Sequence, residues 1–321
     1  MSKKYKIVHI SQTPLVAAPA KVALAQRLIG HDSIAIALND YPNNGPLFQK
    51  FIEDYIVETE FTKPLIDAAI READIIQIHN DLPPAWAERL IHANQAAKYF
   101  YQVHSPLREG PLYVPRQNDI NLPFLANFVV GQFQPRIHNN HIFVPNIIHD
   151  TPMASIRQKG EKLRVIFSPT HLRPGRWNNK YVAELETAMN SLVSLGKIEA
   201  VVPDKPVSPK VLMAVRKTCH VSIDEIATGG FHQVSVEGLA AGNVTINRAD
   251  YFCKAVFSTF AEGNKPPFLY ATGESIAETL HELANDWKKT AELQEASLDY
   301  FKSYLTPEKM ARVFDNAYEN F

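Results

Sequence analysis

The chain has 321 residues, of which 45% are hydrophobic and 21% are charged, which is enough to bury one large core or two ordinary ones. Its 33 Lys and Arg residues nearly balance its 34 Asp and Glu residues, so no global basic field points to nucleic acid or an anionic membrane. The two cysteines, Cys219 and Cys253, lack metal-ligand and redox spacing, so we expect a reducing, cytoplasmic setting. No apolar run reaches the roughly 18 residues of a transmembrane helix, and none predicts a signal peptide.

Short apolar runs alternate with longer helical patterns in the first half, which is typical of a parallel sheet covered by helices. A helix is expected over residues 19–29, with proline in its first turn. The expected strands cover residues 6–10, 33–38, 75–79, 99–104 and 128–130. Three of these runs end on or beside a histidine. Ligands of open parallel sheets collect at the carboxyl ends of the strands, so we expect the chemistry there.

The second half repeats this architecture without repeating the sequence. Residues 150–161 lose the apolar pattern and form the expected interdomain linker. Strands are then expected at 163–167, 198–202, 221–224 and 244–247, and helices at 181–195, from Ser208, at 275–293 and at 307–321. The pattern therefore predicts two domains of the same kind.

The stretch from Thr228 to Gly242 reads TGGFHQVSVEGLAAG, a glycine pair followed by a helical pattern and a closing glycine. Such a turn exposes backbone N–H groups at the positive end of a helix, which suits a phosphate. The stretch resembles the donor-site motif of retaining glycosyltransferases of family 4 and their relatives, approximately E-G-F-G-x-x-x-x-E-A-M-A-x-G. The residues in register are Phe231, Glu237, Gly238, Leu239, Ala240 and Gly242.

This resemblance implies that Glu237 hydrogen-bonds the ribose of a nucleotide while the intervening amides hold a diphosphate. Gly229 replaces the family's first glutamate and His232 its second glycine. The carboxylate is then expected from Asp224 or Glu225, or His232 takes over the sugar contact. An ordinary glycine-bounded helix with a solvated first turn is the plainer alternative. The expected donor-binding residues are Asp224, Gly229, Gly230, Phe231, His232, Gln233, Glu237 and Lys180.

A second candidate segment, SPTHLRPGRWNNK over residues 168–180, follows the first strand of the second half. Its cations can neutralise a diphosphate leaving group, and the resembling family carries a basic segment at this strand end. We expect Arg173 and Arg176 to act in catalysis and rank them above Lys180, because the family's lysine-glycine pair is absent. A charged surface loop is the alternative.

In the first half, the run YFYQVHSPLR over residues 99–108 places His104 at a strand end. The family often carries a histidine there, so the resemblance assigns His104 a catalytic-site contact with the transferring sugar. A role as general base is the weaker expectation, because the leaving phosphate is thought to accept the proton. His79 is expected to flank the acceptor, with Ser11 and Thr13 of the first loop. For both histidines, a structural role beside an apolar run is the alternative.

The remaining candidate motifs lack the residue spacing that a dinucleotide site or a metal site requires. The first loop, SQTPLVAA over residues 11–18, is not a Gly-x-Gly-x-x-Gly turn, which removes the main support for a dinucleotide oxidoreductase. His138 and His141 form a pair without an acidic third ligand. We therefore expect them at the surface rather than on a metal.

Together these features predict an α/β protein of the GT-B class, with two Rossmann-like domains facing across a cleft. The expected bounds are 1–155 for the acceptor domain, 156–305 for the donor domain and 306–321 for a helix that packs back on the first. The expected reaction moves a hexosyl or pentosyl unit from a nucleoside diphosphate sugar, for which we expect a UDP-sugar, with retention of configuration. No permanently bound cofactor is expected, and no metal, because the sequence contains no Asp-x-Asp pair.

The acceptor stays open. A bacterial glycan or lipid-linked saccharide is the default by family frequency, for a cytoplasmic enzyme or one peripheral at the inner membrane face. The rival is a modified, hydroxymethylated base in phage DNA, reached in the host cytoplasm, although the balanced charge argues against it. A sugar-nucleotide epimerase, a phosphorylase of the same fold and an inactive nucleotide-binding module are the remaining alternatives.

Overall fold

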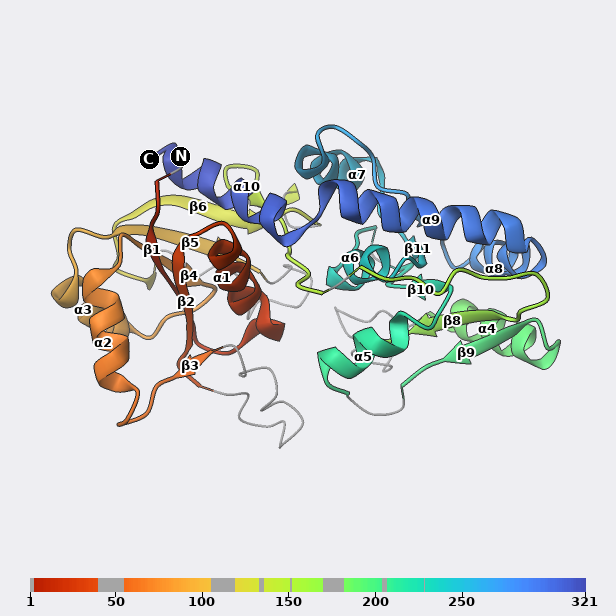
Figure 1. Cartoon of the computed structure of the whole chain (residues 1–321), viewed down its shortest axis with the longest axis horizontal. Helices are drawn as coiled ribbons and strands as arrows, with labels where there is room; N and C mark the ends of the chain where they lie inside the picture. The colour runs from red at the N-terminus through yellow and green to blue at the C-terminus, as the bar shows by residue number, and fades with distance from the viewer. Residues whose placement is uncertain are drawn as a thin grey trace. The chain divides into compact units, whose positions relative to one another are not determined.

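The computed structural model describes residues 3–39, 55–104, 119–132, 136–150, 152–169, 182–203, 207–227 and 229–321. The chain divides into two compact units, Met1–His149 with Pro307–Phe321, and Asp150–Thr306. Each unit contains a parallel sheet with helices packed on it (Figure 1). The predicted fold class, two parallel-sheet α/β domains, is confirmed.

The sheet of the first unit has the strand order β3-β2-β1-β4-β5-β6-β7, and all its neighbouring strands are parallel. The carboxyl ends of the strands therefore share one edge. At this edge, Ser11 lies opposite His79, and His79 lies opposite Gln102. The strands are β1 (Lys6–Ser11), β2 (Asp32–Ala37), β3 (Ile56–Val57), β4 (Ile75–His79), β5 (Lys98–Val103), β6 (Phe124–Val130) and β7 (Ile142–Val144).

Two pairs of helices belong to this sheet. Helices α2 (Lys63–Glu72) and α3 (Pro84–Ala93) contribute Ile66, Ile70 and Leu90 to an apolar core with alternate residues of β1, β4 and β5. Helices α1 (Ala18–Leu28) and α10 (Pro307–Glu319) lie side by side although they come from opposite ends of the chain (Figure 1). A short 3-10 turn, η1 (Leu15–Ala17), leads into α1.

The second unit has the strand order β12-β11-β10-β8-β9, again with parallel neighbours. Its strands are β8 (Leu163–Phe167), β9 (Ile198–Val201), β10 (Val221–Ile223), β11 (Val244–Asn247) and β12 (Leu269–Tyr270). Its helices are α4 (Ala183–Ser194), α5 (Pro209–Arg216), α6 (Gln233–Ala240), α7 (Tyr251–Ser258), α8 (Ile276–Asn285) and α9 (Trp287–Tyr304), with the 3-10 turn η8 (Thr259–Ala261) after α7. The apolar core lies between the sheet and helices α4 and α8. Helix α9 packs against α6 (Figure 1).

The single helix expected over residues 275–293 is wrong, because the structure divides it into α8 and α9 at Asp286. The Asp286 carboxylate accepts the Lys289 N–H at 3.0 Å and so caps α9. The end of α8 is capped by the buried Arg157, whose guanidinium donates to the carbonyls of Leu283 and Ala284. Arg157 belongs to the expected linker, so part of that segment is built into the second unit. Among the described residues, no helix has the length and apolar character to cross a membrane.

Candidate functional site

Strand β10 ends at two buried carboxylates that shape the loop before α6. Glu225 is fully buried and accepts the N–H of Ala227 at 2.9 Å and the N–H of Gly230 at 3.2 Å. Asp224 is 1% exposed and accepts the backbone N–H of His232 at 2.5 Å and the Ser235 hydroxyl at 2.8 Å. Both acids are therefore engaged in holding the loop and the first turn of α6.

His232 stands at the junction between this loop and α6. Its Nδ1 lies 3.1 Å from the Asp224 carboxylate, and its side chain is 19% exposed. Of the three groups that the sequence nominates for the sugar contact, His232 is thus the most accessible, because Asp224 and Glu225 are buried.

The glycine-rich turn depends on backbone conformation. Gly229 has φ of +84°, in the left-handed region where a side chain is strained, although among the described residues a Cβ there would meet no atom within 4 Å. Phe231 directs its ring into the core of the unit, with centroids 5.1 Å from Phe257 and 5.4 Å from Phe268. Among the expected donor-binding residues, Phe231 therefore offers only its backbone.

Glu237 lies one turn into α6 and is held from two sides. Gln233 donates from Nε2 to its Oε1 at 2.9 Å, and the Arg216 guanidinium lies 3.3 Å from its Oε2. Arg216, at the end of α5, is fully buried and also donates to Ser222 Oγ and, at 3.2 Å, to Ser168 Oγ. The Glu237 side chain is 16% exposed, so it is a fixed carboxylate that solvent can reach.

Gly238 of the motif has a packing role. A Cβ at this position would lie 2.6 Å from Thr245 Oγ1 and 3.2 Å from Ser222 Cβ. Glycine therefore lets α6 approach the sheet closely, which fixes the height of Glu237 above the strand ends.

The three cations of the basic segment, Arg173, Arg176 and Lys180, lie outside the described residues. In the first loop, Ser11 is buried and Thr13 is half-buried. The loop continues into three successive non-glycine residues with positive φ, Leu15, Val16 and Ala17, at 46°, 55° and 62°. Such backbone costs about 1–3 kcal/mol for each residue and is concentrated at functional sites in proteins.

At the carboxyl edge of the first sheet, three imidazoles form a chain of contacts. His79 Nε2 lies 2.9 Å from His9 Nδ1, and His79 Nδ1 lies 2.7 Å from His104 Nε2. The backbone N–H of His104 donates to Asn80 Oδ1 at 2.8 Å, and Asn80 itself has a left-handed φ of 61°. The structure thus brings His79 and His104 together, and adds His9, which the sequence reasoning missed.

Burial keeps these rings neutral. It lowers the pKa of His9 to about 4 and the pKa of His104 to about 3. Burial, followed by the repulsion of the His104 and His9 rings, also holds the pKa of His79 well below its ordinary value. At neutral pH all three imidazoles are therefore uncharged.

Beside this edge lies a hollow of about 260 Å³. Its lining includes Gln12, directly after β1, and Asp81, two residues after β4, and it combines two carboxylates with apolar walls. The lining residues are Gln12, Asp81, Leu82, Pro83, Pro84, Asp119 and Ile120.

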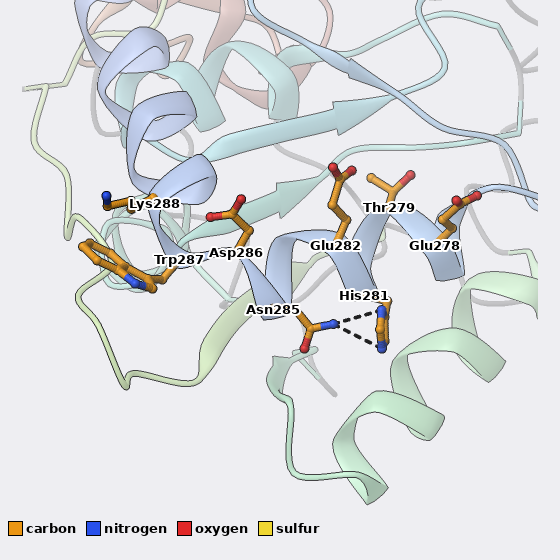
Figure 2. A pocket seen from close by; sticks show the side chains of 8 residues that line it. All are labelled: Glu278, Thr279, His281, Glu282, Asn285, Asp286, Trp287 and Lys288. Carbon is orange, nitrogen blue, oxygen red and sulfur yellow. Dashed lines mark hydrogen bonds between the residues drawn. The ribbon is translucent and has the colours of Figure 1, made fainter.

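A larger hollow of about 920 Å³ belongs to the second unit, where α8 meets α9. Figure 2 shows its polar lining, including the hydrogen bond of 3.0 Å between Asn285 Nδ2 and His281 Nδ1. None of its lining residues belongs to the predicted site.

The histidine pair expected at the surface is in part buried. His138 is 8% exposed, its ring centroid lies 4.9 Å from that of His141, and burial lowers the pKa of both rings. Within the described residues, no group of three or more His, Cys, Asp or Glu side chains is placed to hold a metal ion.

Comparison with known proteins relates the whole chain to solved glycosyltransferase structures. No protein-family model matches the chain, and no curated protein sequence matches it. HepE from Anabaena, solved with UDP and glucose, is 12% identical with a TM-score of 0.61, covering 98% of this chain and 100% of that one.

Two further structures extend this likeness. An alpha-glucosyltransferase in complex with UDP and DNA containing an HMU base is 8% identical, with a TM-score of 0.65 and 98% coverage of both chains. A glycosyltransferase from Rickettsia africae is 14% identical, with a TM-score of 0.56, covering 99% of this chain and 98% of that one. At these identities the likeness establishes the fold, the two parallel-sheet α/β domains of the GT-B class.

Proposed function

We propose that this protein is a glycosyltransferase that takes a sugar from a nucleoside diphosphate donor, a UDP-sugar. The observation that carries the proposal is the start of α6, where buried carboxylates hold the loop and Glu237 stands fixed and accessible one turn later. Backbone amides at a helix start favour a diphosphate, and a fixed carboxylate accepts hydrogen bonds from ribose hydroxyls. Similar folds solved with UDP support this choice of donor.

The proposal assigns the donor to the domain of residues 156–305 and the acceptor to that of residues 1–155, with residues 306–321 completing the first. Glu237 binds the ribose, and the diphosphate lies against the backbone from Gly229 to Gln233. In that stretch the N–H groups of Gly230 and His232 are already held by Glu225 and Asp224. Arg173 and Arg176, assisted by Lys180, neutralise the leaving diphosphate. His232 contacts the sugar from the donor side, because Asp224 and Glu225 are occupied by the loop.

In the reaction proposed, the bond between the anomeric carbon and the diphosphate oxygen breaks, and a bond to the acceptor oxygen forms on the same face. The acceptor proton passes to the departing phosphate oxygen. This retaining course, like independence from a divalent metal, follows the family resemblance of the α6 motif. His104 contacts the transferring sugar, while His79, Ser11 and Thr13 belong to the acceptor side.

For the acceptor we propose a glycan or lipid-linked saccharide. The hollow at the first sheet edge carries two carboxylates, Asp81 and Asp119, which suit neutral hydroxyls better than phosphates. A hydroxymethylated DNA base is the second candidate, favoured by the likeness to the alpha-glucosyltransferase solved with DNA.

Calorimetric titration with UDP tests the donor site. Replacement of the carboxylate in Glu237→Gln should weaken UDP binding by about tenfold to a hundredfold, the worth of a hydrogen bond to a charged group. Since this variant leaves the Arg216 charge uncompensated, the double variant Arg216→Met/Glu237→Gln is measured beside it, and thermal unfolding reports the fold of both. Glu278→Gln, an exposed glutamate on α8, is the matched control. Unchanged UDP affinity in folded Glu237→Gln would contradict the assignment.

An acceptor screen separates the two candidates. Oligosaccharides and DNA containing hydroxymethylated bases are incubated with UDP-sugars, and the added sugar mass is detected by mass spectrometry. We expect transfer to saccharides. Transfer to DNA, with binding that weakens steeply as salt rises, would establish the second candidate instead.

A further inference from the structure

A buried polar network lies on the sheet face that carries α1 and α10. Its members come from four strands or strand ends and two helices; His104 is partly buried and the others are buried. Burying so many polar groups is costly unless their hydrogen bonds are made, so the network specifies one arrangement. The members are His9, Gln26, Ser33, Gln77, His79, Gln102, His104 and Tyr318.

The orientation of the Gln26 amide gives the network its direction. The Ser33 hydroxyl donates to Gln26 Oε1 at 2.7 Å, and Gln26 Nε2 donates to the Tyr318 hydroxyl at 3.3 Å. Tyr318 in turn donates to Gln77 Oε1, and Gln77 Nε2 donates to Gln102 Oε1. Gln26 therefore presents a carbonyl oxygen, which can only accept, to His9.

The tautomers of the three histidines follow from this acceptor. His9 Nε2 lies 2.8 Å from Gln26 Oε1, so Nε2 carries the hydrogen and Nδ1 of this neutral ring carries the lone pair. His79 Nε2, 2.9 Å from that lone pair, must donate to it. His79 Nδ1 is then an acceptor, and His104 Nε2 donates to it at 2.7 Å. By the same rule, the lone pair of His104 lies on Nδ1.

We propose that Gln26, His9 and His79 are positioning residues that hold His104 as the neutral Nε2–H tautomer, so that His104 Nδ1 accepts a hydrogen bond from a sugar hydroxyl. The ligand group is a hydroxyl of the donor sugar or the acceptor sugar, because a phosphate or carboxylate oxygen brings no hydrogen to share. The sugar contact rests on the proposed function, whereas the tautomer is a property of the free protein.

The same network opposes a general-base role for His104. A proton taken at Nδ1 would place a positive charge in a chain of buried, uncharged groups, where burial already disfavours the cation. His104 therefore recognises a hydroxyl without removing its proton.

Nitrogen NMR of the full chain with 15N-labelled histidine tests the tautomer directly. The chain contains 12 histidines, so the three signals are assigned through single variants. At pH 7 we expect His9, His79 and His104 all to show the neutral pattern with hydrogen on Nε2. Hydrogen on Nδ1 of His104, or a protonated ring, would overturn the proposal.

Two substitutions at His79 test positioning. His79→Leu removes the acceptor for His104 Nε2–H, so the His104 signal should shift toward the Nδ1–H form. His79→Gln supplies a carbonyl oxygen toward His104 and an amide donor toward His9, and should restore the Nε2–H form. Ser33→Ala is a milder variant that weakens only the hold on Gln26, and we expect it to broaden the His9 and His104 signals. An unchanged His104 tautomer in folded His79→Leu would contradict the positioning role.

Turnover of UDP-sugars identifies the hydroxyl. Deoxy analogues of the donor sugar, and then of the acceptor sugar, are compared in wild type and His104→Ala. One analogue should lower kcat/KM by about tenfold in wild type, as loss of one hydrogen bond predicts, and by less than about twofold in His104→Ala. Donor-sugar and acceptor-sugar analogues distinguish the two sources of the hydroxyl. Equal losses in both proteins for every analogue would overturn the sugar contact, whereas the absence of any turnover with intact tautomers would count against the proposed function alone.

Discussion

The histidine network of the first unit and the start of α6 in the second unit bury polar groups in different ways. In the first unit, the histidines, glutamines and tyrosine form a chain whose titrating imidazoles are neutral. In the second, Arg216 faces Glu237 and Asp224 holds the start of α6. Neutral hydrogen bonds orient hydroxyl groups without a strong field, whereas the fixed Glu237 carboxylate accepts hydrogen bonds from the hydroxyls of a ribose. The contrast matches the division of labour proposed for sugar and nucleotide.

The largest loss of stability is expected when the ion pair between Arg216 and Glu237 is broken. Glu237→Ala leaves the fully buried Arg216 guanidinium without its carboxylate, which should lower the free energy of unfolding by about 3–5 kcal/mol. Denaturant unfolding followed by circular dichroism measures the loss. The double variant Arg216→Met/Glu237→Gln should recover most of it. A single variant as stable as wild type would show that the pair contributes nothing.

Acid should destabilise the histidine network of the first unit, because its buried imidazoles are neutral at pH 7. The His9 pKa is lowered from 6.5 to about 4 in the folded protein, so its contribution to stability is complete above pH 6.5 and is lost as the pH falls toward 4. At pH 5 the loss from His9 alone is about 2 kcal/mol. Unfolding free energies measured between pH 7 and pH 5 should fall less steeply in His9→Gln than in wild type. His92→Gln, at an exposed histidine, is the matched control. Equal slopes in His9→Gln and in wild type would contradict the prediction.

A smaller effect is expected where α6 meets the sheet. Gly238→Ala places a Cβ 2.6 Å from Thr245 Oγ1, so overpacking should cost about 1–3 kcal/mol. UDP affinity should fall as well, because Glu237 moves with the helix. The control is Gly273→Ala, whose Cβ would lie 3.3 Å from the flexible Glu184 side chain. Equal stability of Gly238→Ala and wild type would contradict the close packing of α6 on the sheet at Thr245.

The smallest effect is expected at the turn. Gly229 has a left-handed φ, and no atom of the described part of the chain would lie within 4 Å of a Cβ there. Gly229→Ala should therefore cost about 1 kcal/mol through backbone strain. Gly229→Asn should cost less, because asparagine tolerates this conformation. Thermal unfolding of both variants measures their relative stabilities. If Gly229→Ala were more stable than Gly229→Asn, backbone strain at this position would not explain the loss.

The sequence predicts the fold well because apolar runs and helical periods are local signals. The α6 motif is a local signal of the same kind, since its glycines and Glu237 lie within a few residues of each other. The capping that separates α8 from α9 was missed because Arg157 acts from far along the chain.

The sequence predicts only part of the two buried polar clusters, the Arg216–Glu237 pair and the histidine network. Arg216 stands in an ordinary amphipathic pattern, and Gln26 meets Tyr318 across 292 residues of sequence. One local signal did exist, because His9 and Ser11, like Gln77 and His79, occupy alternate strand positions on one face. Polar residues alternating with isoleucine in a buried strand indicate a second, polar face.

The position of α10 has a consequence for how the chain is made. The ribosome completes the whole second unit before it synthesises Pro307–Glu319. Until then Gln26 and Gln77 lack Tyr318 as their partner. The buried polar network of the nascent first unit is therefore incomplete. The first unit can therefore complete its hydrogen bonds to Tyr318 only after the second unit has been synthesised.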